Sequence, residues 1–365
     1  MWDMKLYFFI GVTGELIKHA PVIKELQKRK IPFKIITSGQ NKVNFASLGD
    51  YIGILKPDIA FPEKVNKSSV SHFLFWAIKV LLRASFLLTK EFKGVDKTRT
   101  YVIVQGDTVS STLGAFIAKI YGLKLAHIES GDLSFNLLEP FPEELCRSII
   151  IRLADVLFAP NEWAKNNLNF VHGEKVNTKY NLLLESYYWA IKSRSSPEVI
   201  KKLKRYYLLI MRRQEHVIFR KSWSKKMMEF IIKNAPSALN CVILENPLVE
   251  RILESLQTDF DPKTIGKIKI IPGQTYIHFM KLMKKAEFIA TDSCTNQLEA
   301  YFLGKPYLGL RDLTEQIEGL NKNVVIAKSN KQIMKKFLVN YQKYKTKPVT
   351  TKVRPSKIIV DYLLK

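Results

Sequence analysis

Three acidic side chains in the first half of the chain occupy positions where proton-transfer chemistry is expected. Asp107 lies in QGDT and Glu129 in HIESG, each directly after a predicted strand, and Glu143 opens a predicted helix in PFPEE. Acids crowded into one pocket acquire different pKa values, so that one can donate a proton while another removes one from a carbon acid. Spacing alone favours simpler roles: Asp107 as the cap of the following helix, and Glu143 as a charge at a helix N-terminus.

The second half of the chain offers groups that can hold a nucleotide. The run TDSCTNQLE joins a strand end to a helix start, where backbone N–H groups and the hydroxyls of Ser293 and Thr295 can bind phosphate. Glu299 can accept hydrogen bonds from ribose hydroxyls. In MRRQEH, Arg212 and Arg213 can grip a diphosphate through bidentate hydrogen bonds. A helix-surface glutamate and a solvated charge run are the alternative roles.

Short apolar runs alternate with amphipathic runs along the chain, which predicts βαβ units with parallel sheets. The predicted strands are KLYFFIG, PFKIITSG, YVIVQGD, KLAHIE and DVLFAP, and then YYLLIM, NCVILE, KIKIIP, EFIATD and PYLGL. Ligands of open parallel sheets bind outside the carboxyl ends of the strands, which is where the acids and the phosphate-binding candidates stand. The fold expected is therefore α/β, with two Rossmann-like domains and a ligand cleft between them.

The alternation divides the chain into domains. A length of 365 residues exceeds one compact domain. We expect an N-terminal Rossmann-like domain over 1–172, a charge-rich linker over 173–204 and a C-terminal Rossmann-like domain over 205–350. A final helix over 351–365 could pack back on the N-terminal domain.

Cysteine usage and hydropathy exclude several classes of protein. The three cysteines are too few and too scattered for a disulfide framework or a metal cage, and they fit a reducing, cytoplasmic location. The most apolar stretch, residues 72–88, is interrupted by two basic residues before it reaches the length of a membrane span. It is expected as a half-buried helix, and contact with a membrane surface is the less favoured alternative.

The net charge of +25 indicates an anionic partner or a generally basic surface. The lysines are spread over almost every predicted helix, and the sequence contains neither zinc-binding spacing nor an RRM-like aromatic pattern. We therefore expect a basic surface and no nucleic-acid partner.

Taken in order, these segments resemble the non-hydrolysing UDP-N-acetylglucosamine 2-epimerases. The matching runs are GVTGELIKHAPVI, TSGQ, VQGDT, AHIESG, PFPEELCRSIIIRLADVLFAPNE, RRQE, ENPLVERI, YIHFMKLMKKAEFIATDS, QLEA, and LGKPYLGLRD with TE soon after it. The resemblance implies a glycosyltransferase-B-like fold, a common occurrence of dimers, and a reaction without metal or redox cofactor. In that reaction the C2 proton of the sugar is removed and UDP leaves to give a 2-acetamidoglucal. UDP then adds back with C2 inverted.

The resemblance also assigns roles to individual residues. The catalytic acids fall on Asp107, Glu129 and Glu143, and the ribose-binding position falls on Glu299. Further positions of the substrate site fall on Lys18, Gln40, Arg147 and Ser293.

Several motif positions depart from the family pattern. The first turn, usually Gly-Thr-Arg-Pro-Glu, reads GVTGE here, with Thr13 in place of the arginine that faces phosphate. Cys294 and Thr295 replace two glycines that let the backbone approach a phosphate, and Arg212 replaces a histidine. Two further departures are Leu244 for a histidine and Tyr180 for a glycine. The proton-transfer acids are retained and the diphosphate site is rebuilt, so either the substrate differs or Arg212 supplies the charge that Thr13 lacks.

The first hypothesis is an isomerase that inverts C2 of a UDP-N-acetylhexosamine for polysaccharide or glycan precursor synthesis, acting as a homodimer without a cofactor. A glycosyltransferase of the same two-domain fold is the second. A catalytically silent homologue that binds nucleotide-sugars is the third. Fold alone does not separate them.

Overall fold

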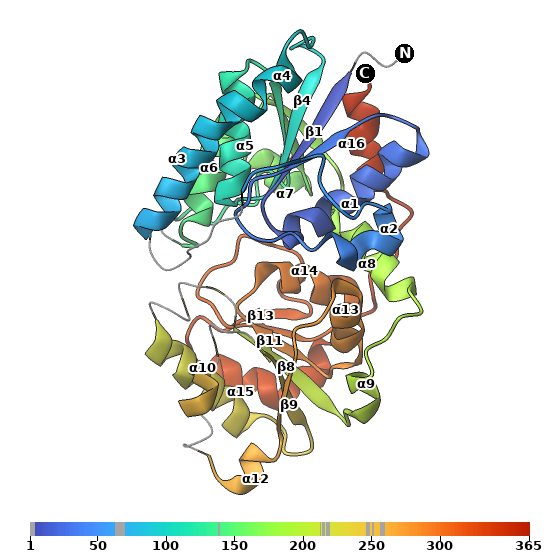
Figure 1. The fold of residues 1–365 in the computed structure, drawn as a ribbon. Helices are drawn as coiled ribbons and strands as arrows, with labels where there is room; N and C mark the ends of the chain where they lie inside the picture. The colour runs from blue at the N-terminus through green and yellow to red at the C-terminus, as the bar shows by residue number, and fades with distance from the viewer. Residues whose placement is uncertain are drawn as a thin grey trace. The chain divides into compact units, whose positions relative to one another are not determined.

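The chain forms two compact units in a computed structural model that describes residues 4–62, 70–137, 139–211, 213, 216, 220–245, 249, 252–255 and 260–365. The first unit comprises Met1–Ser186 and Lys352–Lys365, and the second comprises Tyr187–Thr351 (Figure 1). Helix α8, Leu183–Lys192, contains the boundary between them.

The first unit is built on a seven-stranded sheet in the order β3-β2-β1-β4-β5-β6-β7, and every neighbouring pair is parallel. In this sheet Phe8 of β1 lies opposite Ile35 on one side and Ile103 on the other. The strands are β1 Lys5–Ile10, β2 Lys34–Thr37, β3 Ile59–Ala60, β4 Thr100–Gln105, β5 Lys124–Ile128, β6 Val156–Ala159 and β7 Glu174–Asn177. From Leu6 to Ile10 every side chain is buried, which explains why β1 is a continuous apolar run instead of an alternating one.

Helices cover both faces of this sheet (Figure 1). Helices α3, α5 and α6 lie on one side, and α1 and α16 lie on the other. The helices of the unit are α1 Thr13–Lys28, α2 Gly49–Ile52, α3 Val70–Leu87, α4 Thr89–Phe92, α5 Val109–Ile120, α6 Glu143–Leu153, α7 Glu162–Asn166 and α16 Pro355–Leu363, with a 3-10 turn η1 at Phe45–Leu48. Gly114 lets α5 approach the sheet, because an added Cβ there would lie 2.8 Å from Val104 and 2.9 Å from the Phe9 ring.

The second unit is built on a six-stranded parallel sheet in the order β10-β9-β8-β11-β12-β13. Its strands are β8 Tyr206–Ile210, β9 Asn240–Leu244, β10 Ile268–Ile271, β11 Ile289–Thr291, β12 Tyr307–Gly309 and β13 Val324–Ile326. Its described helices are α9 Val199–Lys202, α10 Lys221–Asn234, α12 Pro262–Ile265, α13 Tyr276–Lys285, α14 Cys294–Leu303 and α15 Lys331–Asn340, followed by the 3-10 turn η3 Tyr341–Tyr344. The aromatic rings of Tyr207 and Phe288 stack at 4.7 Å in its core.

The predicted α/β class with two Rossmann-like sheets is confirmed, and each predicted strand coincides with an observed one to within two residues at either end. The prediction missed β3, β7 and β13, which are two to four residues long. Of these, β7 has the sequence EKVN and lies at an edge of its sheet. Its side chains are mostly polar and reach solvent, so no run of apolar residues predicts the strand. Both β7 and α8 fall within 173–204, the segment expected as a linker.

The apolar stretch 72–88 forms most of α3, a half-buried helix as expected. Trp76 and Val80 face the core, whereas Leu82 and Phe86 are 68% and 84% exposed. Among the helices that the structure describes, none is long and apolar enough to cross a membrane.

Candidate functional site

The ends of β4 and β5 bring Asp107 and Glu129 to neighbouring positions in the first unit. Gln105, the last residue of β4, pairs with Ile128, the last residue of β5. The Gly106 N–H then donates to the Ile128 carbonyl at 3.0 Å, so the segments that follow β4 and β5 leave the sheet side by side. Thr108 caps α5 by accepting from the Ser111 N–H at 3.0 Å, and the capping role considered for Asp107 is therefore wrong.

Glu129 is a buried carboxylate held by donors from three parts of the unit. Its Oε2 accepts from Lys18 Nζ at 2.5 Å and from the Gln105 amide, and its Oε1 accepts from Asn181 Nδ2 at 2.7 Å. Its backbone has a φ of +66°, in the left-handed region that a non-glycine residue adopts only when its surroundings enforce it. Burial disfavours the charge of Lys18, but the Glu129 carboxylate outweighs this and raises the pKa of the lysine above its ordinary value.

Asn181 has a fixed orientation toward Glu129. Its Oδ1 accepts from the Leu183 N–H at 3.0 Å at the start of α8, which leaves Nδ2 to face the carboxylate. Near the same helix start, Ser186 Oγ donates to the Ile17 carbonyl at 2.6 Å and ties α8 to α1. The catalytic candidate is thus held from α1, β4 and the segment before α8.

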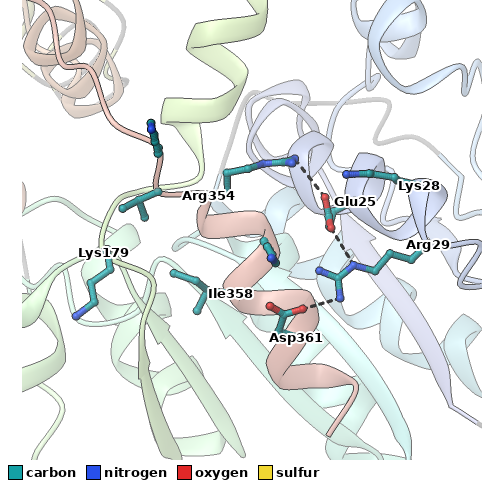
Figure 2. A pocket seen from close by; sticks show the side chains of 10 residues that line it. Glu25, Lys28, Arg29, Lys179, Arg354, Ile358 and Asp361 are labelled. Carbon is teal, nitrogen blue, oxygen red and sulfur yellow. Dashed lines mark hydrogen bonds and ion pairs between the residues drawn. The ribbon is translucent and has the colours of Figure 1, made fainter.

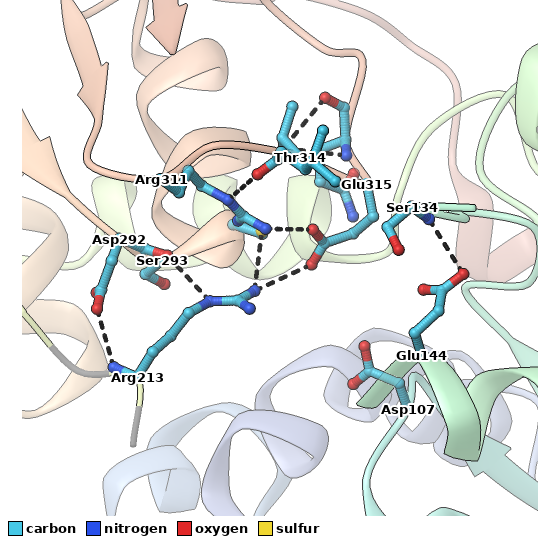
Figure 3. Close-up of polar contacts among 12 residues, drawn as sticks. Asp107, Ser134, Glu144, Arg213, Asp292, Ser293, Arg311, Thr314 and Glu315 are labelled. Carbon is cyan, nitrogen blue, oxygen red and sulfur yellow. Dashed lines mark hydrogen bonds and ion pairs between the residues drawn. The ribbon is translucent and has the colours of Figure 1, made fainter. Parts of the chain in front are cut away.

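Arg147, a buried residue of α6, forms ion pairs with both Asp107 and Glu144. Glu144 also accepts from the Ser134 N–H at 3.1 Å, as Figure 3 shows. Arg147 therefore contacts Glu144, whereas Glu143 stands half-buried in the first turn of α6. Arg147 thus places its positive charge directly against the Asp107 carboxylate.

The charges of Asp107 and Glu143 both act on the thiol of Cys146. Burial raises the pKa of the Cys146 thiol to about 11, and the charges of Asp107 and Glu143 act in the same direction. Asp107 also contributes, with Glu129, to the raised pKa of Lys18. Asp107 therefore shares Cys146 as a neighbour with Glu143, and it shares Lys18 with Glu129, at one edge of the sheet.

His127 is buried beneath this edge of the sheet, and its hydrogen bonds select one tautomer of the ring. Its Nε2 is 2.7 Å from the Gly106 carbonyl oxygen, which can only accept, so Nε2 carries the proton and Nδ1 accepts from Ser130 Oγ at 2.7 Å. Burial lowers the pKa of His127 to about 4, which keeps the ring neutral at physiological pH.

The first turn, GVTGE, is organised by Glu15. This buried carboxylate accepts from the Gly11 and Val12 N–H groups at 2.5 and 3.1 Å, and from Thr108 Oγ1 and Ser111 Oγ at 2.5 and 2.8 Å. Burial nevertheless raises its pKa above the ordinary value.

Thr13 and Gln40 serve local structure next to this turn. The Thr13 hydroxyl, at the position where the family pattern has an arginine, accepts from the Asn44 N–H at 2.9 Å. Gln40 Oε1 accepts from the Ser110 N–H at 2.9 Å, in the first turn of α5.

In the second unit Arg213 is bound on several sides (Figure 3). Its N–H donates to Asp292 Oδ2 at 3.0 Å and its Nε donates to the Asp292 carbonyl at 3.1 Å. Its Nη2 lies 3.3 Å from both Glu315 Oε1 and Cys294 Sγ. Glu315 is shared with Arg311, whose Nη2 donates to Oε2 at 2.6 Å. Arg212 lies outside the described residues.

The start of α14 carries the predicted phosphate-binding residues. Ser293 caps the helix by accepting from the Asn296 N–H at 3.4 Å, and Thr295 lies half-buried in the first turn. Glu299 is only 2% exposed, so the helix-surface role considered for it is wrong. Asn296 Nδ2 donates to Glu299 at 2.7 Å, and burial together with the Glu299 charge raises the pKa of Tyr276 well above its ordinary value.

Sequence reasoning missed several polar residues of these two sites. The missed residues are Glu15, Gln105, Glu144, Asn181, Arg311 and Glu315. Glu144 had a local signal, since it stands three residues before Arg147 on one helix, and Glu15 stands four residues after Gly11 in the glycine turn. Asn181 had none, because its partner is 52 positions away. Within the part of the chain that the structure describes, no three His, Cys, Asp or Glu side chains are grouped to hold a metal ion.

Comparison with known proteins shows similarity to UDP-N-acetylglucosamine 2-epimerases over most of the chain. The family model described as UDP-N-acetylglucosamine 2-epimerase matches residues 24–354. A UDP-N-acetylglucosamine 2-epimerase of Methanocaldococcus jannaschii is 30% identical over 345 residues, covering 91% of each chain. One of Neisseria meningitidis is 28% identical and covers 99% of this chain and 100% of its own. The crystal structure of the M. jannaschii enzyme in complex with UDP-GlcNAc and UDP superposes with a TM-score of 0.83 at 26% identity, covering 99% of this chain and all of that one.

Proposed function

Because this chain belongs to the UDP-N-acetylglucosamine 2-epimerase family, we propose that it inverts C2 of a UDP-N-acetylhexosamine by eliminating and re-adding UDP. The observation that carries the proposal is the pairing of two strand-end carboxylates with cations of low exposure, Glu129 with Lys18 and Asp107 with Arg147. A carboxylate positioned at the end of a parallel strand can act as a general base toward a bound sugar.

Inversion requires acids on both faces of the sugar. Removal of the C2 proton by a carboxylate forms the C1=C2 double bond while the C1–O bond breaks and its electron pair leaves with UDP. In the return step UDP adds to C1, and C2 must receive a proton on the opposite face. One group therefore accepts the proton and a different group donates one, which is why a set of three acids, Asp107, Glu129 and Glu143, suits this reaction.

The nucleotide is assigned to the second unit. Glu299 accepts hydrogen bonds from the ribose hydroxyls, and the start of α14 with Ser293 and Thr295 faces phosphate. Arg213 and Arg212 supply positive charge, with Arg212 replacing the cation absent at Thr13. In the first unit Lys18 and Arg147 keep Glu129 and Asp107 in position, and Gln40 stands beside the sugar.

The experiment that tests this function is incubation of the purified protein with UDP-N-acetylglucosamine and no added acceptor. The expected result is an equilibrium mixture of the substrate and its C2 epimer, observed by proton NMR. A glycosyltransferase would transfer the sugar only when an acceptor is supplied, and a silent homologue would bind the nucleotide without turnover. Either of those results would refute the proposed reaction.

We also propose that the protein acts as a cytoplasmic homodimer that supplies a polysaccharide or glycan precursor. The exposed apolar side chains of α3, Phe75, Ile78, Leu82 and Phe86, form a face that a second copy can cover. The cysteines are free and buried, as suits a reducing compartment. Sedimentation of the parent as a dimer and of Leu82→Glu as a monomer is expected, and a monomeric parent would contradict the dimer.

A further inference from the structure

A basic hollow of about 890 Å³ opens in the first unit between the end of α1 and the start of α16, remote in sequence from the acids (Figure 2). Three separate segments line it: the last turns of α1, the loop after β7, and residues 352–361. The cationic lining residues are Lys28, Arg29, Lys179, Lys352, Arg354 and Lys357. No role in the proposed epimerase reaction uses them.

The two carboxylates of this hollow are already occupied by its arginines. Arg29 Nε lies 2.8 Å from Glu25 Oε1 and its Nη1 lies 2.6 Å from Asp361 Oδ1. Arg354 Nη2 lies 3.2 Å from Glu25 Oε2, and Figure 2 shows the same chain of contacts. The acids therefore fix the arginines in place, and the lysines carry the excess charge.

Three of the four lysines of the hollow have no compensating acid among the residues that the structure describes. Lys28, Lys352 and Lys357 are exposed and form no salt bridge with any residue that the structure describes. Lys179 has only a distant contact, at 3.9 Å from Glu162. The lining thus has an excess of four positive charges. Like charges facing one concavity repel one another and raise the local positive potential, and a bound anion relieves both effects.

The start of α16 does not itself supply the binding groups. The Ser356 N–H donates to Glu185 Oε1 at 2.8 Å, so the first turn of the helix is already capped. An anion in the hollow must be held by the lysine side chains. Ammonium groups bind phosphate as point charges and tolerate varied geometry.

We propose that this hollow binds a small molecule carrying two or more linked phosphates. Its volume lies within the range of roughly 300–1,000 Å³ that small-ligand sites have. Its excess charge matches an oligophosphate better than a singly charged anion. Val353 and Ile358 add an apolar part to the lining, against which the organic portion of such a ligand can pack.

Inorganic tripolyphosphate is the probe, titrated calorimetrically at low ionic strength with UDP in excess to occupy the proposed nucleotide site. The test variant is Lys28→Gln/Lys352→Gln/Lys357→Gln. The matched control is Lys263→Gln/Lys322→Gln/Lys335→Gln, which removes the same charge from exposed lysines of the second unit. We expect one site in the parent, a loss of about tenfold or more in the test variant, and affinity within about twofold of the parent in the control.

A thermal scan gives an independent measurement. Tripolyphosphate should raise the melting temperature of the parent and the control but not of the test variant, because a ligand stabilises only the state that binds it. No binding by the parent, equal affinity in the test variant, or equal losses in both triple variants would overturn the proposal. These measurements involve no turnover, so their outcome is independent of whether the protein is an epimerase.

Discussion

Replacing Lys18 by methionine removes the cation from the buried pair with Glu129 while keeping a side chain of similar length. The two side chains are 14% and 9% exposed and their charged atoms are 2.5 Å apart, so solvent screens the pair weakly. Breaking a buried pair by removing one partner costs about 3–5 kcal/mol, because the remaining charge stays buried. Gln105 and Asn181 still donate to Glu129, so we expect the lower end, about 3 kcal/mol.

The matched control is Lys119→Met. Lys119 lies 2.7 Å from Asp155, but these side chains are 33% and 28% exposed, and the loss should be about 1 kcal/mol or less. Urea unfolding followed by circular dichroism measures both variants. The double variant Lys18→Met/Glu129→Leu removes both charges and should recover most of the stability lost in Lys18→Met, while remaining inactive.

Equal losses in Lys18→Met and Lys119→Met would refute the description of Glu129 as a buried carboxylate that depends on Lys18. A double variant no more stable than Lys18→Met would also count against it. In that case the destabilisation would come from lost packing and not from an uncompensated charge.

The remaining predictions concern separate parts of the molecule. Asn181→Asp places a second negative charge beside Glu129, and we expect turnover to fall at least about tenfold with UDP affinity unchanged; equal turnover would mean that Asn181 does not position the acid. Burial lowers the pKa of His19 from 6.5 to about 3. The folded state therefore resists protonation of this ring, which should account for about 2 kcal/mol of the stability lost from pH 7 to pH 5, in addition to the loss from His127, whose pKa burial also lowers. A His19→Leu variant that loses as much stability as the parent over this pH range would exclude His19 as a source. Glu299→Gln should weaken binding of UDP more than binding of its 2′,3′-dideoxy analogue, and calorimetry giving equal losses would argue against ribose recognition. Arg212→Ala should weaken UDP binding by about 1.5–3 kcal/mol, and an unchanged dissociation constant would remove Arg212 from the diphosphate site.

The sequence predicted the sheets well because their strands are buried on both faces. Runs such as LYFFI and YYLLI are apolar throughout and are followed by turns and amphipathic helices, which is the pattern of a doubly wound unit. The short edge strand EKVN has no such pattern, because solvent reaches its side chains. Local hydropathy therefore identifies the apolar strands, the edge strand β10 included, and loses the short edge strands β3, β7 and β13.

The candidate site was predictable in part. The strand-end rule indicated Asp107 and Glu129, the helix start in PFPEE indicated Glu143, and the resemblance added Lys18 and Arg147. The partners of the acids were not predictable, because contacts such as Lys18 with Glu129 join positions 111 residues apart. The resemblance indicated that Lys18 belongs to the site, but only the structure shows that it pairs with Glu129.

The same reason explains the misassigned local roles. A capping role for Asp107 and a surface role for Glu299 follow from helix position alone. Thr108 takes the cap, and the packing of α14 buries Glu299. Tertiary packing, which local spacing does not encode, decides both.

Solvent deuterium incorporation at C2 of UDP-N-acetylglucosamine tests the central claim most directly. In heavy water the parent should exchange the C2 proton as the epimers interconvert, because the proton removed from one face is replaced from solvent-equilibrated acids on the other. Asp107→Asn, Glu129→Gln and Glu143→Gln should each slow this exchange by about a hundredfold to ten-thousandfold. UDP binding should remain nearly intact in all three, since the nucleotide is assigned to the second unit. Exchange at the parent rate in all three variants, or no deuterium at C2 with the parent protein, would contradict the account.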